Sequence, residues 1–217
     1  MIEWNKTKKN IIIDFDGVIL DSRQRHSEVL SDSINKINGL KTISDDYKDF
    51  VSYKSNGYPG INYLIEKKIP NDEKIIAEWI KRIEQKKYLQ FDVLYPGTKQ
   101  SLEKLKNKYN LLLVTVRSNH KNAYWQLSHL NILNYFCKII LVNNKGNPGL
   151  DKYNALCSLP IFAVIGDTEV DLALSEYAQC FFFPMNNGFR SLSYWNKFKK
   201  KSYQNLMEVT NIIYKIQ

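Results

Sequence analysis

Residues 11–17 read IIIDFDG, three isoleucines followed by two carboxylates around a phenylalanine and then a glycine. An apolar run that breaks into a polar loop is typical of a strand buried on both faces of a parallel sheet. Asp14 and Asp16 then lie at the carboxyl end of that strand, where functional groups gather in doubly wound sheets. The stretch therefore predicts a Rossmann-like α/β fold with a site built on these two aspartates.

The second half of the chain alternates between helix-like and strand-like segments. A turn signal, YPG at residues 95–97, opens this part. From the spacing of apolar residues we expect helices at 98–108, 120–130, 152–158 and 170–177, and strands at 111–116, 138–142, 161–165 and 181–183. Strands that alternate with helices favour a parallel sheet with right-handed crossovers.

The segment between the first strand and the turn signal has a different character. Its apolar residues recur at three- and four-residue spacing among many charges, which is typical of surface helices. Because it interrupts the alternation of strands and helices, we interpret it as an insertion. We assign residues 1–20 and 93–217 to the α/β core and residues 21–92 to an α-helical cap domain, in which residues 53–60 form a turn-rich loop.

Length and composition limit the classes to which the chain can belong. With 217 residues, of which 44% are hydrophobic and 24% charged, it reads as a globular protein with one core and a modest insertion. No apolar stretch approaches the roughly 20 residues of a membrane-spanning helix, and the polar first ten residues lack the apolar centre of a signal peptide. We expect a cytoplasmic protein without a membrane partner, with reduced thiols at Cys137, Cys157 and Cys180.

The charge of the chain favours anionic partners. The formal net charge is +9 and the pI is near 9.3. This balance fits a phosphorylated metabolite as well as nucleic acid. The densest basic run, at residues 197–201, is interrupted by Phe198, and we interpret it as a solvated face rather than as a nucleic-acid contact.

The later strands are also expected to end in polar residues. Thr115 closes one predicted strand and Arg117 follows it, whereas Asp167 and Asp171 follow another. Lys152 lies at the start of the predicted helix 152–158, which connects the predicted strands 138–142 and 161–165. Parallel strands end at a common edge, so we expect these side chains to approach the first two aspartates.

Three carboxylates at one sheet edge would repel one another. Asp14, Asp16 and Asp167 need a cation or a shared proton in a partly desolvated pocket. Mg²⁺ is the hard cation that is commonly held by few carboxylates together with water and phosphate oxygens. A phosphate group at this place would find a positive charge on Lys152 and a hydroxyl donor on Thr115.

These stretches resemble the motifs of the haloacid dehalogenase superfamily of phosphohydrolases, in its branch with an α-helical C1-type cap. DFDGVILDS at residues 14–22 resembles the first motif, Thr115 the second, Lys152 the third, and GDTEVD at residues 166–171 the fourth. The resemblance implies a magnesium-dependent phosphatase, a phosphoric monoester hydrolase. Its substrate would be a small phosphorylated metabolite such as a sugar phosphate or a nucleotide.

The resemblance also implies how the aspartates divide the work. Asp14 would be the nucleophile and form an aspartyl-phosphate intermediate. Asp16 would protonate the leaving oxygen and then activate water. The side chains of Asp14 and Asp167 and the backbone carbonyl of Asp16 would hold Mg²⁺. Asp171 would support the metal through water or orient the phosphate-binding lysine.

The residues that would grip the substrate follow from the same resemblance. Thr115 and Lys152 would hold the transferring phosphoryl group. Lys145 is the alternative to Lys152, which we favour because it opens the helix that leads to the next strand. Three further residues are candidates for substrate contact: His26, Lys54 and Arg117.

Other activities stay open at this point. A phosphomutase of the β-phosphoglucomutase type would use the same residues, and His26 and Lys54 favour it. A polynucleotide phosphatase is suggested by the basic charge. A dehalogenase is disfavoured, because those enzymes lack a carboxylate at the position of Asp16. A non-catalytic protein is disfavoured because no catalytic position has been lost.

Overall fold

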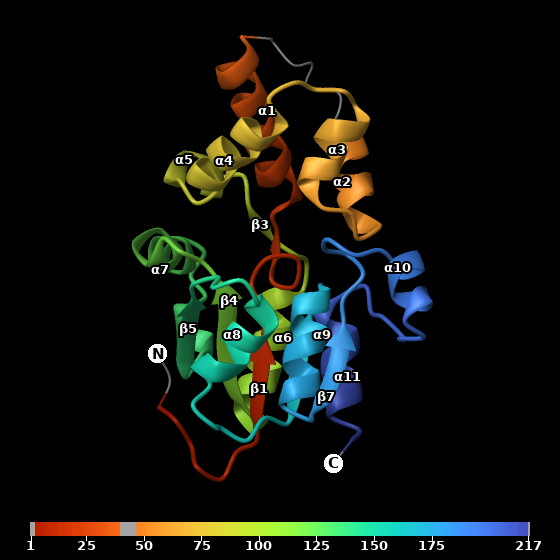
Figure 1. Ribbon diagram of the computed structural model, residues 1–217. Coiled ribbons are helices and arrows are strands. Elements are labelled where there is room, and N and C mark those ends of the chain that lie inside the picture. Colours follow the sequence, from red (N-terminus) through yellow and green to blue (C-terminus); the bar gives the residue numbers. More distant parts are fainter. Residues whose placement is uncertain (1–2, 40–46, 217) are drawn as a thin grey trace.

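Figure 1 shows the computed structural model of the chain, which describes residues 3–39 and 47–216. Within these residues, five strands form a sheet in the order β5-β4-β1-β6-β7, and every pair in it runs parallel. The predicted parallel α/β sheet is therefore confirmed. The strands are β1 (Asn10–Ile13), β4 (Asn110–Val116), β5 (Lys138–Val142), β6 (Ala163–Gly166) and β7 (Phe181–Pro184).

The isoleucine run occupies the centre of the sheet. β1 pairs with β4 on one side and with β6 on the other, and its residues are all buried. Ile11 and Ile13 belong to one apolar cluster and Ile12 to another, because successive side chains of a strand point to opposite faces. The covering helices are α6 (Thr98–Lys108) and α11 (Leu206–Ile213) on the first face, and α8 (Pro148–Ala155) and α9 (Glu169–Tyr177) on the second.

Helix α8 begins at Pro148, so the prediction that Lys152 opens this helix is wrong. The side chain of Asn147 accepts a hydrogen bond from the backbone N–H of Leu150, which caps the helix. Pro148 then occupies the first turn, where its missing N–H has no intrahelical partner to lose. Lys152 consequently lies inside the helix, buried against the sheet.

Two further helices lie near the carboxyl edge of the sheet. Helix α7 (His120–His129) follows β4 and matches the predicted segment. Helix α10 (Leu192–Lys197) follows β7 and was not predicted. Its short apolar stretch is anchored by Trp195, which is fully buried and donates a hydrogen bond from Nε1 to the carbonyl of Met185.

The helical segment lies between two short strands that pair antiparallel, β2 (Leu20–Asp21) and β3 (Val93–Leu94). We call residues 23–89 the cap; Figure 1 shows it over the carboxyl ends of the sheet strands. Residues 40–46, inside the expected cap, lie outside the described residues. The cap helices are α1 (Arg23–Asn38), α2 (Tyr47–Ser55), α3 (Gly60–Glu66), α4 (Asp72–Arg82) and α5 (Lys86–Leu89).

The cap has an apolar core of its own. Leu30 and Ile34 of α1 pack with Phe50 of α2, Leu64 of α3 and Ile75 of α4. This separate cluster explains the helical spacing of apolar residues in the segment. Among the described helices, none reaches the length and hydrophobicity that a bilayer-spanning segment requires.

Candidate active site

Lys152 forms ion pairs with two of the carboxylates that the sequence predicts at this edge, Asp14 and Asp171. Its Nζ lies 2.7 Å from Asp14 Oδ1, at the end of β1, and 2.7 Å from Asp171 Oδ1, in the first turn of α9. The lysine is only 2% exposed, so both ion pairs are shielded from water. Lys145 is exposed on the loop before α8, and its backbone N–H donates to Asp151. The structure thus places Lys152, and not Lys145, beside Asp14.

Three carboxylates cluster around this lysine. Asp14, Asp167 and Asp171 each offer an oxygen, and these oxygens lie within 4.8 Å of one another. Asp167 is fully buried in the loop after β6, and its Oδ2 accepts a hydrogen bond of 2.6 Å from the backbone N–H of Phe189. Its Oδ1 is buried and has no hydrogen-bond partner among the described residues. A divalent cation would satisfy this oxygen, so the donor set fits a metal.

Two glycines allow the backbone to approach Asp167 closely. A Cβ added to Gly17 would lie 2.0 Å from Asp167 Oδ2, and one added to Gly188 would lie 2.2 Å from it. Gly17 also has a φ of +78°, which L-residues with a side chain rarely adopt. Both positions therefore require glycine for the carboxylate to sit at the sheet edge.

The burial of this cluster changes its protonation. Burial, and secondarily the nearby Asp171, raise the pKa of Asp14 from 3.8 to about 7 against the opposing charge of Lys152. Burial together with the neighbouring carboxylates also raises the pKa of Asp167 well above its usual range. The raised pKa values mean that these carboxyl groups hold protons more tightly than free ones, because several negative charges side by side in a buried site are unfavourable. A bound cation would take the place of these protons and favour the ionised carboxylates.

Asp171 is held by its own helix. Its Oδ2 accepts hydrogen bonds from the hydroxyl of Thr168, at 3.0 Å, and from the backbone N–H of that residue, at 3.3 Å. Because its other oxygen contacts Lys152, both of its oxygens already have partners. The geometry thus lets Asp171 orient the lysine.

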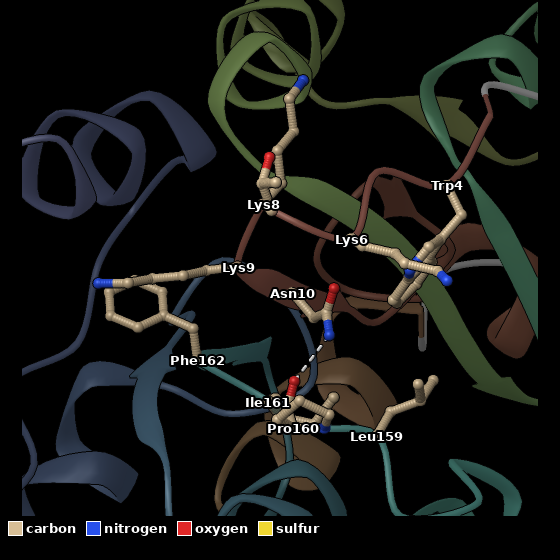
Figure 2. A pocket seen from close by; sticks show the side chains of 10 residues that line it. Trp4, Lys6, Lys8, Lys9, Asn10, Leu159, Pro160, Ile161 and Phe162 are labelled. Carbon is tan, nitrogen blue, oxygen red and sulfur yellow. Dashed lines mark hydrogen bonds between the residues drawn. The ribbon is translucent and has the colours of Figure 1, made fainter.

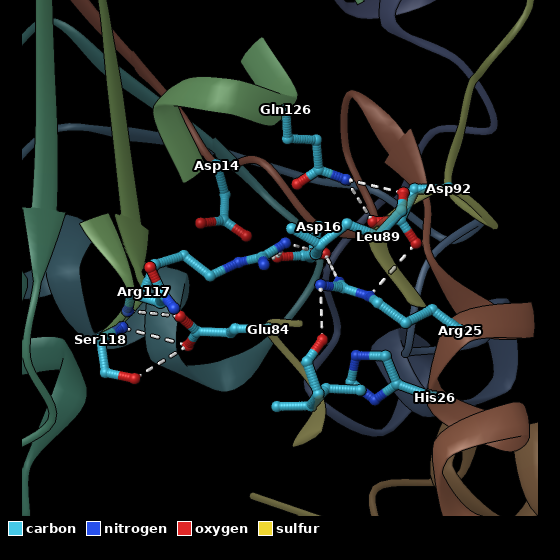
Figure 3. Close-up of polar contacts among 12 residues, drawn as sticks. Asp14, Asp16, Arg25, His26, Glu84, Leu89, Asp92, Arg117, Ser118 and Gln126 are labelled. Carbon is cyan, nitrogen blue, oxygen red and sulfur yellow. Dashed lines mark hydrogen bonds and ion pairs between the residues drawn. The ribbon is translucent and has the colours of Figure 1, made fainter. Parts of the chain in front are cut away.

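Asp16 lies between two buried arginines (Figure 3). Arg117, just beyond β4, forms two hydrogen bonds of 2.9 Å with its two oxygens. Arg25, on α1 of the cap, contacts Asp16 Oδ1 and also lies 3.2 Å from Asp92 Oδ1. Burial alone would raise the pKa of Asp16, but Arg117 and Arg25 outweigh it and lower this pKa to about 2. Asp16 is therefore ionised in this arrangement.

Arg25 was missed by the reading of the sequence. It is 1% exposed and lies one helical turn before Val29, which is also buried on α1. A charged residue whose spacing from apolar residues places it on the buried face of a helix needs a buried partner of opposite charge. That signal was present in the sequence, but the partners could not be named from it.

His26 and Lys54 meet inside the cap. Lys54 Nζ lies 3.0 Å from His26 Nδ1, 4.3 Å from the ring centroid of Phe189 and 5.6 Å from that of Trp79. Burial, with the charge of Arg190, lowers the pKa of Lys54 to about 8. Burial and Lys54 lower the pKa of His26 well below its usual range, so the imidazole is neutral and accepts from the ammonium.

Thr115 is buried near the end of β4, where it pairs in register with Leu141 of β5. It lies on the strand that leads to Arg117, so the strand end carries both residues to the edge of the sheet where Asp14 lies. The structure thus brings Thr115 to the same edge as Asp14.

Further polar contacts hold the cap against the core. Glu84, between α4 and α5, accepts hydrogen bonds from the backbone N–H groups of Ser118, at 3.0 Å, and Asn119, at 2.5 Å (Figure 3). Arg190, which follows β7, donates to the carbonyl of Lys54 at 2.9 Å and pairs with Glu169 at 2.6 Å. These contacts close the cap over the carboxylates.

We compare two cavities that are lined by described residues as candidate binding sites. One of about 590 Å³ lies by the amino end of β1 (Figure 2). Two of its three lysines have partners: Lys8 Nζ donates to the carbonyl of Lys106, and Lys9 Nζ lies 4.5 Å from the ring centroid of Phe162, which also lines the cavity. The other, of about 410 Å³, is lined by cap residues and by Glu169 and Arg190 of the core. Of these two cavities, the second adjoins the residues around the carboxylates.

Comparisons with known proteins agree with this geometry. The family model "Haloacid dehalogenase-like hydrolase" matches residues 11–183. The chain is 24% identical over 191 residues to the phosphoglycolate phosphatase of Rhodobacter capsulatus. The alignment covers 83% of this chain and 85% of that protein.

Solved structures share the fold. A haloacid dehalogenase-like family hydrolase from Streptococcus pneumoniae has a TM-score of 0.72 at 17% identity, covering 96% of this chain and 100% of that one. A haloacid dehalogenase superfamily hydrolase of subfamily IA from Geobacter sulfurreducens has a TM-score of 0.61 at 21% identity, covering 85% of this chain and 90% of that one.

Proposed function

Because this chain belongs to the haloacid dehalogenase-like hydrolases, we propose that it is a magnesium-dependent phosphatase that works through an aspartyl-phosphate intermediate on Asp14. Similarity to a phosphoglycolate phosphatase supports a small phosphorylated metabolite as the substrate. The observation that carries the proposal is the pairing of Lys152 Nζ with Asp14 and Asp171, each at 2.7 Å. Beside this pair lies Asp167 Oδ1, which has no hydrogen-bond partner among the described residues.

In the first step, an oxygen of Asp14 attacks the phosphorus and the bond between phosphorus and the leaving oxygen breaks. Asp14 must be ionised for this attack, and the ammonium of Lys152 favours the ionised form. We propose that Lys152 and the hydroxyl of Thr115 also hold the transferring phosphoryl group, whose oxygens need positive charge and donors. We propose that the leaving oxygen takes its proton from Asp16. This requires that Asp16 be protonated in the substrate complex and that its contacts with Arg25 and Arg117, which keep it ionised here, loosen when substrate binds.

In the second step, water attacks the phosphorus of the aspartyl phosphate and restores the Asp14 carboxylate. Asp16 accepts the proton that the water loses. Its ionised state between Arg25 and Arg117 suits a base, since only the ionised carboxylate can accept. We propose that Arg117 acts by positioning Asp16, because both of its contacting nitrogens are already committed to that carboxylate.

The carboxylates are the proposed metal ligands. We propose that the side chains of Asp14 and Asp167 and the backbone carbonyl of Asp16 hold Mg²⁺, with Asp171 outside the ligand set. When bound, the ion neutralises the carboxylates and polarises the phosphoryl oxygens. We propose that the cap and its flanking residues form a domain of residues 21–92, which excludes bulk water and brings Lys54 and His26 toward the substrate.

The test is release of inorganic phosphate from a panel of phosphorylated metabolites, with Mg²⁺ and with a chelator. We expect release that the chelator abolishes. Formation of an isomer without free phosphate would identify a phosphomutase instead. Preference for phosphorylated oligonucleotides, falling steeply with salt, would identify a polynucleotide phosphatase. Absence of turnover on every phosphoester would overturn the proposal.

A further inference from the structure

The cavity between the cap and the core has mainly apolar walls. It measures about 410 Å³, within the range of pockets for small ligands. Cap helices α1 to α4 and the loop between α2 and α3 supply most of its lining. The principal apolar and aromatic lining residues are Leu30, Phe50, Tyr58, Pro59, Ile76 and Trp79.

The charged groups of the lining are already engaged with one another. Arg190 Nη2 and Nε lie 2.6 and 2.7 Å from the two oxygens of Glu169. Arg190 Nη1 donates to the carbonyls of Lys54, at 2.9 Å, and Phe189, at 2.7 Å. The ammonium of Lys54 contacts the imidazole of His26. A polyhydroxylated ligand would therefore have to break these contacts or leave its hydroxyls unpaired, and unpaired buried hydroxyls are unfavourable.

The cavity adjoins residues that contact the proposed catalytic carboxylates. Lys54 lines it and also lies 4.3 Å from the ring of Phe189. The backbone N–H of Phe189 in turn donates to Asp167 Oδ2 at 2.6 Å. Glu169, at the core side of the cavity, is the first residue of α9 and follows Asp167 by two residues. A phosphate ester bound at Asp14 would thus direct its organic part toward this apolar space.

We infer that the leaving group of the substrate is an apolar alcohol, alkyl or aryl, rather than a sugar. This inference rests on the proposed phosphatase function and narrows it. Apolar surface gains free energy when it leaves water, in proportion to the area buried. The apolar walls of the cavity favour that burial, and they offer hydroxyl groups few hydrogen-bond partners that are not already engaged.

The first experiment measures kcat/KM for phosphate release by the full chain with Mg²⁺. Ethyl, butyl, hexyl and phenyl phosphate are compared with glucose 6-phosphate and phosphoglycolate. We expect kcat/KM to rise about fourfold with each methylene added from ethyl to hexyl, as expected for a buried methylene. We also expect hexyl or phenyl phosphate, whichever is better, to exceed glucose 6-phosphate by at least about tenfold.

The outcomes separate the inference from the function on which it rests. A flat alkyl series, or a preference for glucose 6-phosphate or phosphoglycolate, overturns the inference and leaves the phosphatase function standing. Absence of phosphate release from all six compounds and from the metabolite panel overturns the phosphatase function itself. A rise along the alkyl series or a preference for phenyl phosphate supports the apolar leaving group and shows which kind the cavity takes.

Variants of the cavity provide the second experiment. A Cβ at Gly60 would meet Phe50 at 3.7 Å and Ile76 at 3.9 Å, which are ordinary contacts, so Gly60→Leu adds a side chain to the cavity without a backbone clash. We expect it to lower kcat/KM for hexyl phosphate about tenfold and to leave ethyl phosphate nearly unchanged. An equal fall for both substrates, with an unchanged Tm, would contradict the inference.

A milder pair of variants guards against misfolding. Ile80 lines the cavity and is 62% exposed, whereas Ile65 is 57% exposed and lies outside the lining. Both changes to glutamine are therefore expected to fold. Ile80→Gln should weaken the dependence of kcat/KM on chain length, and Ile65→Gln should retain it. The same dependence in both variants would count against this cavity as the binding site.

Discussion

The guanidinium of Arg25, on the first helix of the cap, contacts the carboxylate of Asp16, on the loop that follows the central strand of the core. Arg25 is also within ion-pair distance of Asp92, which precedes β3. One buried side chain thus joins the cap, the candidate proton-transfer residue and the segment through which the chain returns from the cap. A change at Arg25 is therefore expected to affect both stability and turnover.

Arg25→Met should lower the free energy of unfolding by about 3 kcal/mol, because the buried Asp92 loses its ion-pair partner and Asp16 keeps only Arg117. It should also lower kcat/KM, since Asp16 loses one of the two groups that position it. The control is Arg23→Met on the same helix, whose partner Asp21 is partly exposed; there we expect a loss under about 1 kcal/mol. Urea unfolding of both variants measures the difference. Equal losses would contradict a structural role for the buried ion pair.

Asp14→Asn should abolish turnover, with a loss of at least about a thousandfold, because an amide is a far poorer nucleophile than a carboxylate. We expect its Tm to stay close to that of the wild type, since the raised pKa of Asp14 shows that burial already disfavours the charged form. Phosphate release and thermal unfolding give the two readouts. Asp49→Asn, at an exposed carboxylate of the cap, serves as the control. Retention of more than a few per cent of the wild-type rate would remove Asp14 as the nucleophile.

The metal-free protein should lose stability as the pH rises from about 4 to about 7. Asp14 has a folded pKa of about 7 against an ordinary 3.8, and the pKa of Asp167 is also raised. The folded state therefore binds these protons more tightly than the unfolded chain and loses that advantage as they dissociate. Urea unfolding in chelator should show a fall of at least about 1 kcal/mol across this range.

Asp167→Asn should reduce that pH dependence and weaken the metal site. The neutral amide removes a buried charge, so the metal-free variant is expected to be at least as stable as the wild type at neutral pH. It also removes a carboxylate ligand, so the increase in Tm on addition of Mg²⁺ should shrink markedly. If Mg²⁺ raises the Tm of the variant and the wild type equally, Asp167 is not a ligand.

Loss of the Lys54 charge should limit activity at alkaline pH. Burial lowers the pKa of Lys54 to about 8, with Arg190 and Arg25 adding to the effect and Asp167 and Asp16 opposing it. Its ammonium is therefore lost as the pH rises through about 8, and we expect kcat/KM to fall there. Lys54→Arg keeps its charge at this pH, so the fall should move to higher pH. A fall that persists unchanged in this variant would assign it to another group.

Much of the α/β core was accessible from local patterns. The isoleucine run, the turn signal at residues 95–97 and the alternation of helices with strands predicted the parallel sheet, because each signal involves neighbouring residues. The start of α8 was misplaced because the capping role of Asn147 competes with the apolar spacing that begins later. Helix α10 was missed since it is short and depends on the buried Trp195.

The candidate site divides in the same way. Asp14, Asp16 and Asp167 could be named in advance because a carboxylate that directly follows a buried strand has few other places to lie. The contacts of these residues depend instead on how distant segments pack: Lys152 reaches Asp14 across 138 residues of chain, and Arg117 reaches Asp16 across 101. Nothing in the sequence around Arg25 or Phe189 indicates which aspartate each one contacts. Their contacts with Asp16 and Asp167 are decided by how the cap and the core pack at the edge of the sheet.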